Sequence, residues 1–255
     1  ERGWRVTSPN LEQCGLLGID YAHLDSLCGD AAAWTDAHAV LQNLHPDVRR
    51  RITDALLDHV RHELCIHTPY LDFKEQSRMR RDSQQRLKDP WVIDEDEYME
   101  RSRIAFPRAG SPDDRTGDRL RFVGPRSNFG LFLKNRLTDA TGERPKDEDT
   151  MKIIHDLFRA LARAGIVVEA ETPKDPAEVP GYQIAASSLV WLPGDGITGA
   201  VDVLRTPSLD AQGARVNSFF VRHYQGRAKL GAGLRSREHT AQVPAAERQA
   251  RETAF

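Results

Sequence analysis

In the middle of the chain, two helical patterns are followed directly by β-type runs, and this order constrains the fold more than any other feature. Ser127 can cap the first helix, and Gly142 can end it. Asp147 or Asp149 can cap the second helix, and Gly165 is well placed just past its end. The apolar residues that repeat at helical spacing in the two segments are Phe129, Leu131, Phe132, Leu133, Leu137, Met151, Ile154, Leu157, Phe158 and Leu161.

The residues that follow the second helix are typical of strands. Ile166-Val167-Val168 is a β-branched run, and a proline-bearing loop extends from Thr172 to Pro180. Residues 182–184 and 189–192 are rich in aromatic and β-branched side chains and indicate a second strand region. Two helices joined by a turn and followed by a two-stranded hairpin with a long tip have the layout of a winged helix. We therefore expect a winged-helix-like domain at residues 118–200.

Residues 1–110 are expected to form a helical connecting region. Pro46 can occupy the first position of a helix, and Asp47 is favourable beside the positive end of the helix dipole. The apolar positions of this helix form an i, i+4 stripe that comprises Val48, Ile52, Leu56, Leu57, Val60 and Leu64. Residues 74–89 predict a second, highly charged helix. Residues 107–117 are rich in Pro, Gly, Asp and Ser and indicate a linker.

The composition indicates a charged globular protein of mixed α/β, helix-rich fold, with 255 residues, 39% of them hydrophobic and 29% charged. No apolar run approaches the roughly eighteen residues of a membrane span, so we expect no membrane partner. Three cysteines at irregular spacing argue against a disulfide framework and predict a reducing, cytoplasmic location. The chain begins without Met and stops within a helical pattern, and we expect both ends to be cuts in a longer protein.

Charge is unevenly distributed, although the formal net charge is only -2. From Arg215 onward, eight Lys/Arg stand against three Asp/Glu, so this segment carries +5 and the rest of the chain -7. A basic segment beside an acidic remainder permits a polyanionic partner. A solvated, charged helix is the alternative explanation.

Phosphate-binding chemistry has no motif in this sequence. A P-loop needs Gly-x-x-x-x-Gly-Lys-Ser/Thr, because backbone N–H groups and a lysine must surround the phosphates, and no such run occurs. Gly194-Asp195-Gly196 lacks the lysine and is interpreted as a turn. Residues 94–97 are acidic but lack the preceding apolar strand of a magnesium site, so we interpret them as a solvated turn. A nucleophile motif such as Gly-x-Ser-x-Gly is also absent, and we expect no catalytic residue in this chain.

His59, His62, Cys65 and His67 form the one cluster whose residue types suit a metal. Their spacing lets two or three of them share a helix face. Structural zinc sites join two ligand pairs from separate elements, however, and the nearest second pair, His38 and His45, lacks a recognised spacing. We favour surface or part-buried histidines and expect no metal, and a metal-binding domain is the alternative.

The winged-helix layout leads to a nucleic-acid hypothesis. The second helix would be the recognition-type helix, and the basic residues of the two helices could neutralise phosphates. Those residues are Arg126, Lys134, Arg136, Lys152, Arg159 and Arg163. Acidic side chains in the hairpin, Glu169, Glu171, Asp175 and Glu178, would repel a nucleic-acid backbone. A role as a protein-packing spacer is therefore the alternative.

The segment Gly233-Leu-Arg-Ser-Arg-Glu-His-Thr-Ala-Gln-Val243, followed by Glu247, Arg248 and Phe255, resembles the second motor lobe of superfamily-two helicases. The sequence of this segment most resembles that of the large bacterial DEAD/DEAH-box helicases, including those associated with phage defence. The stretch Trp4–Leu17 resembles a segment that follows the first motor lobe of those helicases. Residues 181–184 and the strand around Trp191 resemble the module between the lobes.

The resemblance implies an accessory, lobe-connecting part of an ATP-dependent helicase that contacts DNA or positions the motor lobes. Residues 214–255 would begin a RecA-like second lobe, and the ATP- and Mg²⁺-binding motifs would belong to the parent protein outside this chain. It further implies that four residues position nucleic acid or transmit lobe closure: Arg237, His239, Thr240 and Arg248. The implied partners are nucleic acid, the remaining helicase lobes and defence-system proteins. A stand-alone winged-helix module that binds DNA or protein is the alternative.

Overall fold

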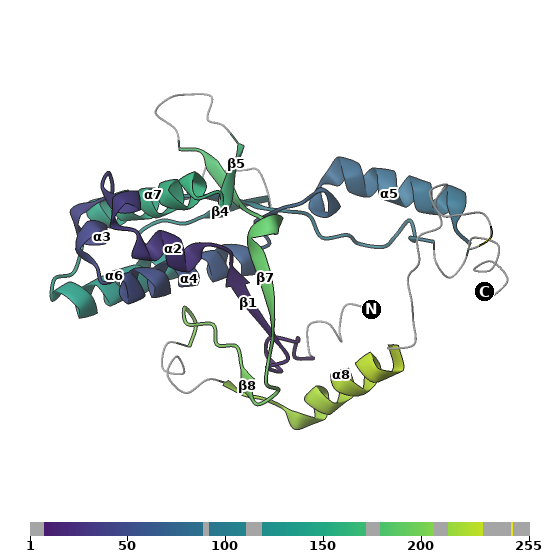
Figure 1. Ribbon diagram of the computed structural model, residues 1–255. Coiled ribbons are helices and arrows are strands. Elements are labelled where there is room, and N and C mark those ends of the chain that lie inside the picture. The colour runs from purple at the N-terminus through teal and green to yellow at the C-terminus, as the bar shows by residue number, and fades with distance from the viewer. Residues whose placement is uncertain are drawn as a thin grey trace. The chain divides into compact units, whose positions relative to one another are not determined.

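The computed structural model describes residues 8–88, 92–110, 119–171, 179–206, 214–231 and 246. The chain divides into two compact units. The larger unit comprises Gly18–Pro193 and Val201–Gly213, and the smaller unit comprises Glu1–Leu17, Gly194–Ala200 and Ala214–Phe255. The larger unit contains both helices and strands, so the expected mixed α/β, helix-rich class is confirmed (Figure 1).

The N-terminal part of the larger unit is a strand followed by short helices and one long helix. Its elements are β1 (Leu17–Tyr21), α2 (Leu24–Gly29), the 3-10 turn η1 (Ala31–Trp34), α3 (Ala39–Asn43) and α4 (Pro46–His62). The predicted helix after Pro46 is thus confirmed, with Pro46 in its first turn and the His45 side chain accepting a hydrogen bond from the Asp47 N–H. Most of its apolar stripe is buried: Ile52, Leu56, Leu57 and Val60 belong to the core, whereas Val48 is partly buried and Leu64 lies beyond the end of the helix.

A buried cation fastens these short helices to α4. Arg49 is 3% exposed and lies 5.0 Å from the centroid of the Trp34 ring. Its guanidinium donates hydrogen bonds to the carbonyl oxygens of Cys28, Leu41, Gln42 and Leu44. Each of these carbonyls lies at or near the end of a short helix, where helical partners are lacking. Arg49 therefore supplies the capping that the sequence of these helices does not.

The central sheet of the larger unit is built around one strand. Its strands are β2 (Ile66–His67), β3 (Ile104–Phe106), β4 (Leu120–Phe122), β5 (Val167–Glu171) and β6 (Gly181–Ala185). β5 and β6 are antiparallel, with Val167 opposite Ile184, whereas β2 and β6 are parallel. β3 meets β6 antiparallel at Ala105 and Tyr182, and β4 extends the sheet parallel to β3. The predicted linker therefore lies between two strands that pair with each other.

The helices α6 (Asn128–Thr141) and α7 (Asp147–Arg163) complete the core. α4 packs against α2, α6 and β6, and α7 packs against α6 and β5, so the helices gather in one layer beside the sheet (Figure 1). Phe129, Phe158 and Leu161 are at most 1% exposed. The Phe158 ring stacks on Tyr182 of β6 at 5.0 Å between centroids. Both predicted helices and the hairpin that follows them are therefore confirmed as local elements.

The second strand region differs from the expectation. Residues 182–184 belong to β6, whereas β7 (Leu189–Pro193) pairs with β1 in a separate two-stranded sheet (Figure 1). A 3-10 turn, η4 (Ala186–Ser188), separates the two strands. The Ser188 carbonyl accepts a hydrogen bond from the Ala22 N–H just after β1, and this contact directs the chain away from β6.

Between β2 and β3 the chain forms the 3-10 turn η2 (Pro69–Leu71) and the charged helix α5 (Phe73–Arg86), which confirms the helix predicted at residues 74–89. Asp72 caps α5 by accepting hydrogen bonds from the N–H groups of Lys74 and Glu75. Only Gln76 and Ser83 of this helix are buried. α5 lies apart from the helical layer (Figure 1).

The smaller unit contains the short strands β8 (Thr198–Gly199) and β9 (Ala214–Arg215), which pair antiparallel, and the helix α8 (Ser218–Gly231). Tyr224 of α8 donates a hydrogen bond to the Pro9 carbonyl over 2.9 Å. Asp195 accepts hydrogen bonds from the N–H groups of Ile197 and Thr198, which confirms the turn expected at residues 194–196. None of the helices that the structure describes is long and apolar enough to cross a membrane.

Candidate nucleic-acid interface

The start of α6 is a tight junction that ends in an exposed cation. Ser127 caps the helix by accepting a hydrogen bond from the Gly130 N–H at 3.1 Å and donates one to the Gly124 carbonyl at 2.7 Å. Gly130 lies so close to this turn that a Cβ atom there would be 2.2 Å from the Gly124 oxygen. Arg126, which immediately precedes Ser127, is 90% exposed at its side chain and pairs with Asp147 at 3.2 Å.

Lys134 and Arg136, the other predicted basic residues of α6, are engaged within the larger unit. The Lys134 side chain is 8% exposed, and its ammonium donates to the carboxylate of Asp147 in the first turn of α7. This hydrogen bond holds the pKa of the Asp147 carboxyl below its usual range. Arg136 is 32% exposed, pairs with Asp139 at 3.7 Å and lies 5.5 Å from the centroid of the Phe132 ring.

Two of the three basic residues on α7 face the segment before α3. Arg159 donates to the Asp36 carbonyl at 2.8 Å and pairs with Asp156 at 2.6 Å. Arg163 pairs with the Asp36 carboxylate at 3.4 Å. Both side chains are about half exposed. The acidic partners therefore reduce the positive potential around the two arginines but leave the side chains accessible to solvent. Lys152, in contrast, is exposed two turns earlier on the helix.

Arg126 and Lys152 flank a cavity of about 850 Å³ at the first turns of α6 and α7. Apolar and backbone groups of Phe122, Gly124, Pro125 and Met151 line it. Asp147 and Glu148 also reach it, so its rim carries both signs of charge. Among the predicted basic residues of the two helices, Arg126 and Lys152 are thus the two that line this cavity.

The hairpin after α7 presents acidic side chains. Glu169 and Glu171 on β5 are exposed, as expected for a strand end that faces solvent. The predicted acidic residues Asp175 and Glu178 lie outside the described residues. The hairpin is therefore a poor phosphate contact as far as its described part extends.

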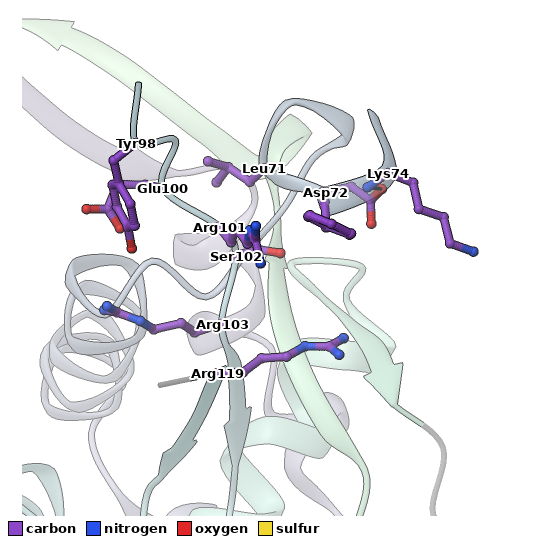
Figure 2. A pocket seen from close by; sticks show the side chains of 10 residues that line it. Leu71, Asp72, Lys74, Tyr98, Glu100, Arg101, Ser102, Arg103 and Arg119 are labelled. Carbon is purple, nitrogen blue, oxygen red and sulfur yellow. Dashed lines mark hydrogen bonds between the residues drawn. The ribbon is translucent and has the colours of Figure 1, made fainter. Parts of the chain in front are cut away.

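A second basic surface, which the sequence analysis missed, lies where α5 begins (Figure 2). Arg101, Arg103 and Arg119 line a cavity of about 640 Å³ with Lys74 and the rings of Phe73 and Tyr98. Arg101 and Arg103 are two residues apart in the segment before β3; Arg101 lies over the Phe73 ring, and Arg103 pairs with Glu63. This Arg-x-Arg spacing beside exposed aromatic residues was the available sequence signal.

The residues singled out for a metal lie at the end of α4 and in and just before β2. Among the residues that the structure describes, no group of three or more His, Cys, Asp or Glu could hold a metal ion. Cys65 is fully buried, and burial raises the pKa of its thiol to about 12. Burial also lowers the pKa of His59. Both shifts result from packing in the core.

The four residues chosen by resemblance, Arg237, His239, Thr240 and Arg248, lie outside the described residues. Comparisons with protein-family models, curated proteins and solved structures found no match for this chain. The functional conclusion therefore depends on the geometry above and on the sequence itself.

Proposed function

We propose that this chain is an accessory, lobe-connecting part of an ATP-dependent DEAD/DEAH-box helicase and that its α6–α7–β5–β6 module contacts DNA. The observation that supports the DNA-binding role best is the order of the module. Two packed helices are followed by an antiparallel hairpin with a long tip. The helicase assignment is supported by the resemblance of residues 233–243 to the second motor lobe of superfamily-two helicases.

The surroundings of the module support a winged-helix-like interpretation. α4 precedes it in the chain and packs against α6, so three helices surround one core. β3 pairs antiparallel with β6, which gives the hairpin the third strand that winged helices use. The difference lies in the insertion between α4 and β3, which carries β2 and α5.

Arg126 and Lys152 are the residues we expect to contact phosphates. Both are exposed and border the same cavity, next to the N-termini of α6 and α7, where the helix dipoles favour anions. Asp147 and Glu148 oppose them, so the interaction should be weak and sensitive to salt. Arg159 and Arg163 would add a longer-range attraction.

A role in packing against protein is the second candidate. It is favoured by one observation, the contact of Arg159 and Arg163 with Asp36, which shows that part of the α7 surface already packs against another segment. In this protein-packing role the module would bind a protein through the same helix and would show no affinity for DNA.

Duplex DNA binding tests the module. Fluorescence anisotropy of a labelled duplex should show binding that weakens as salt increases, and Arg126→Glu/Lys152→Glu should reduce it about tenfold or more. Arg51→Glu/Arg81→Glu is the matched control, because it makes the same charge change at two exposed positions on α4 and α5. Equal loss in both double variants, or none in either, would contradict a phosphate contact at Arg126 and Lys152.

The helicase assignment has a separate test. The isolated chain is expected neither to hydrolyse ATP nor to unwind DNA, and robust ATP turnover would contradict it. Determination of the flanking coding sequence should reveal a Gly-x-Gly-Lys-Thr and DExH pair upstream and an arginine-rich motor motif downstream. Their absence would leave the stand-alone module as the better account.

A further inference from the structure

The cavity at the start of α5 lies between two segments that are hydrogen-bonded to each other. The Gln76 side chain, 5% exposed, donates hydrogen bonds to the carbonyl oxygens of Tyr70 and Glu100 at 2.9 and 2.6 Å. The Ser102 N–H donates to the Leu71 carbonyl at 3.1 Å. These bonds join the turn before α5 to the extended segment that leads into β3. The cavity between them, about 640 Å³, is within the size range of small-ligand sites.

Positive charge predominates in this cavity. Lys74, Arg101, Arg103 and Arg119 line it, against Asp72 and Glu100, and the Arg103 guanidinium already pairs with Glu63 at 3.8 Å. The Asp72 carboxylate accepts the N–H groups of Lys74 and Glu75 through Oδ1 as the cap of α5 and keeps its negative charge, so the four cations face two carboxylates in the lining. In Figure 2 the side chains of Lys74 and Arg119 extend toward the right of the view, whereas that of Arg103 extends toward the left. The cavity therefore offers several cations to an anionic ligand.

Aromatic rings stand beside these cations. Phe73 and Tyr98 line the cavity and are 55% and 59% exposed, unusually open for their types. The Arg101 guanidinium lies over the Phe73 ring, 4.1 Å from its centroid, and this cation–π contact holds the two side chains together. Exposed rings next to guanidinium groups are the combination that proteins use to bind single strands, where bases stack and phosphates are neutralised.

We propose that this cavity is a subsite for single-stranded nucleic acid, in which Phe73 and Tyr98 stack on bases and Arg101 and Arg119 contact the backbone. The proposal rests on the nucleic-acid function proposed above and adds a second contact, separate from the α6–α7 surface. A single strand is favoured over a duplex because the faces of paired bases are stacked on one another and cannot reach the rings. An acidic peptide would pair with the cations but would have no bases to stack on the two aromatic rings.

The test uses the intact 255-residue chain and a labelled oligothymidine of about 15 nucleotides, near the upper end of the usual length of a single-strand site. Arg101→Glu/Arg119→Glu should weaken binding about tenfold or more and lower the slope of log affinity against log salt by about 1.4. Arg81→Glu/Arg78→Glu is the control, because both residues lie on α5 outside the cavity lining.

The rings are tested separately from the charges. Phe73→Ala should weaken oligothymidine binding at least about fivefold, whereas Phe73→Tyr should bind as the unaltered chain does, since stacking needs only the ring. Circular dichroism and thermal unfolding establish that each variant folds. A polyglutamate peptide serves as the probe for an acidic-peptide site.

The outcomes separate this proposal from the proposed function. If the cavity variants bind oligothymidine normally while Arg126→Glu/Lys152→Glu loses duplex binding, the cavity proposal is wrong and the module's role stands. If the unaltered chain binds neither single-stranded nor duplex DNA, both proposals fail. Equal effects of Phe73→Ala and Phe73→Tyr, or displacement of oligothymidine by polyglutamate at similar concentration, would also overturn the cavity proposal.

Discussion

The Lys134 ammonium donates a hydrogen bond to the Asp147 carboxylate, which joins the middle of α6 to the first turn of α7. The lysine side chain is almost fully buried, so this pair ties the two helices together at the edge of the core. A residue that the sequence offers as a phosphate contact is thus also a structural tie. The same Asp147 pairs with Arg126, so removal of Lys134 would change the field at the candidate surface.

We expect Lys134→Met to return the pKa of the Asp147 carboxyl toward its ordinary range. The folded-state pKa of Asp147 is depressed, so the pair stabilises the fold above the unfolded pKa of about 3.9 and loses this effect as pH falls through the folded pKa. The stability difference between the two proteins should therefore shrink below about pH 4. Carboxyl NMR titration with urea unfolding at several pH values measures both, and a pH-independent difference would contradict the ion pair.

Arg49→Ala is expected to destabilise the larger unit by about 2–4 kcal/mol. The change removes charge-assisted hydrogen bonds to four carbonyl groups and leaves buried acceptors without their donor. Arg51→Ala, an exposed position two residues on, should stay within about 0.5 kcal/mol. Urea unfolding of the two variants decides this, and similar free energies of unfolding would show that the Arg49 contacts contribute little.

Gly130→Ala should impair the start of α6. The new Cβ atom would be 2.2 Å from the Gly124 oxygen and 2.6 Å from the Pro125 carbonyl carbon, both of them backbone atoms that cannot turn aside. We expect a loss of about 1–3 kcal/mol from this overpacking. Gly29→Ala, where a Cβ atom would meet nothing within 4 Å, is the control. Thermal unfolding should separate the two variants, and an unchanged midpoint for Gly130→Ala would refute the close approach.

The three thiols are expected to resist alkylation in the folded protein. Cys14, Cys28 and Cys65 are buried, and burial raises the pKa of each thiol, that of Cys65 to about 12. At pH 8 the reactive thiolate is therefore scarce as well as shielded. Reaction with an excess of a thiol reagent should be slow until urea unfolds the chain and should then become fast. Rapid native labelling of Cys65 would contradict its burial.

Local patterns in the sequence predicted α4, α5, α6, α7 and the hairpin from apolar spacing and end signals. The expected cap of α7 at Asp147 or Asp149 was wrong, because the helix begins at Asp147 and its N-cap residue, Lys146, makes no side-chain capping hydrogen bond. Local patterns did not predict that β1 pairs with β7, since these strands lie far apart in the chain and share no local signal. They also did not reveal that Lys134 is buried. Lysine is usually exposed, and its burial here depends on how α6 and α7 pack, which the local sequence does not encode.

The cavity residues show the same limit at the level of a site. Phe73, Arg101 and Arg119 come from three segments that the buried Gln76 side chain and the pairing of β3 with β4 bring together. Residue types alone could suggest an arginine-rich stretch but not its neighbours. The domain boundaries drawn at residues 110, 118 and 214 stay predictions, and the compact units of the structure are divided at other positions.

Asp36 gives the last prediction, because it is the acid that faces the C-terminal half of α7. Its carboxylate pairs with Arg163, and its carbonyl accepts from Arg159. Asp36→Asn keeps the carbonyl contact and removes one negative charge from the surface of a helix that we propose to contact DNA. Duplex affinity should therefore rise, by about twofold to fivefold at low salt, with the gain fading as salt increases. Anisotropy titrations with Asp139→Asn as control, an exposed acid on α6 that pairs with Arg136, test this. If Asp36→Asn leaves affinity unchanged while Arg126→Glu/Lys152→Glu abolishes it, DNA contacts only the N-terminal ends of the two helices.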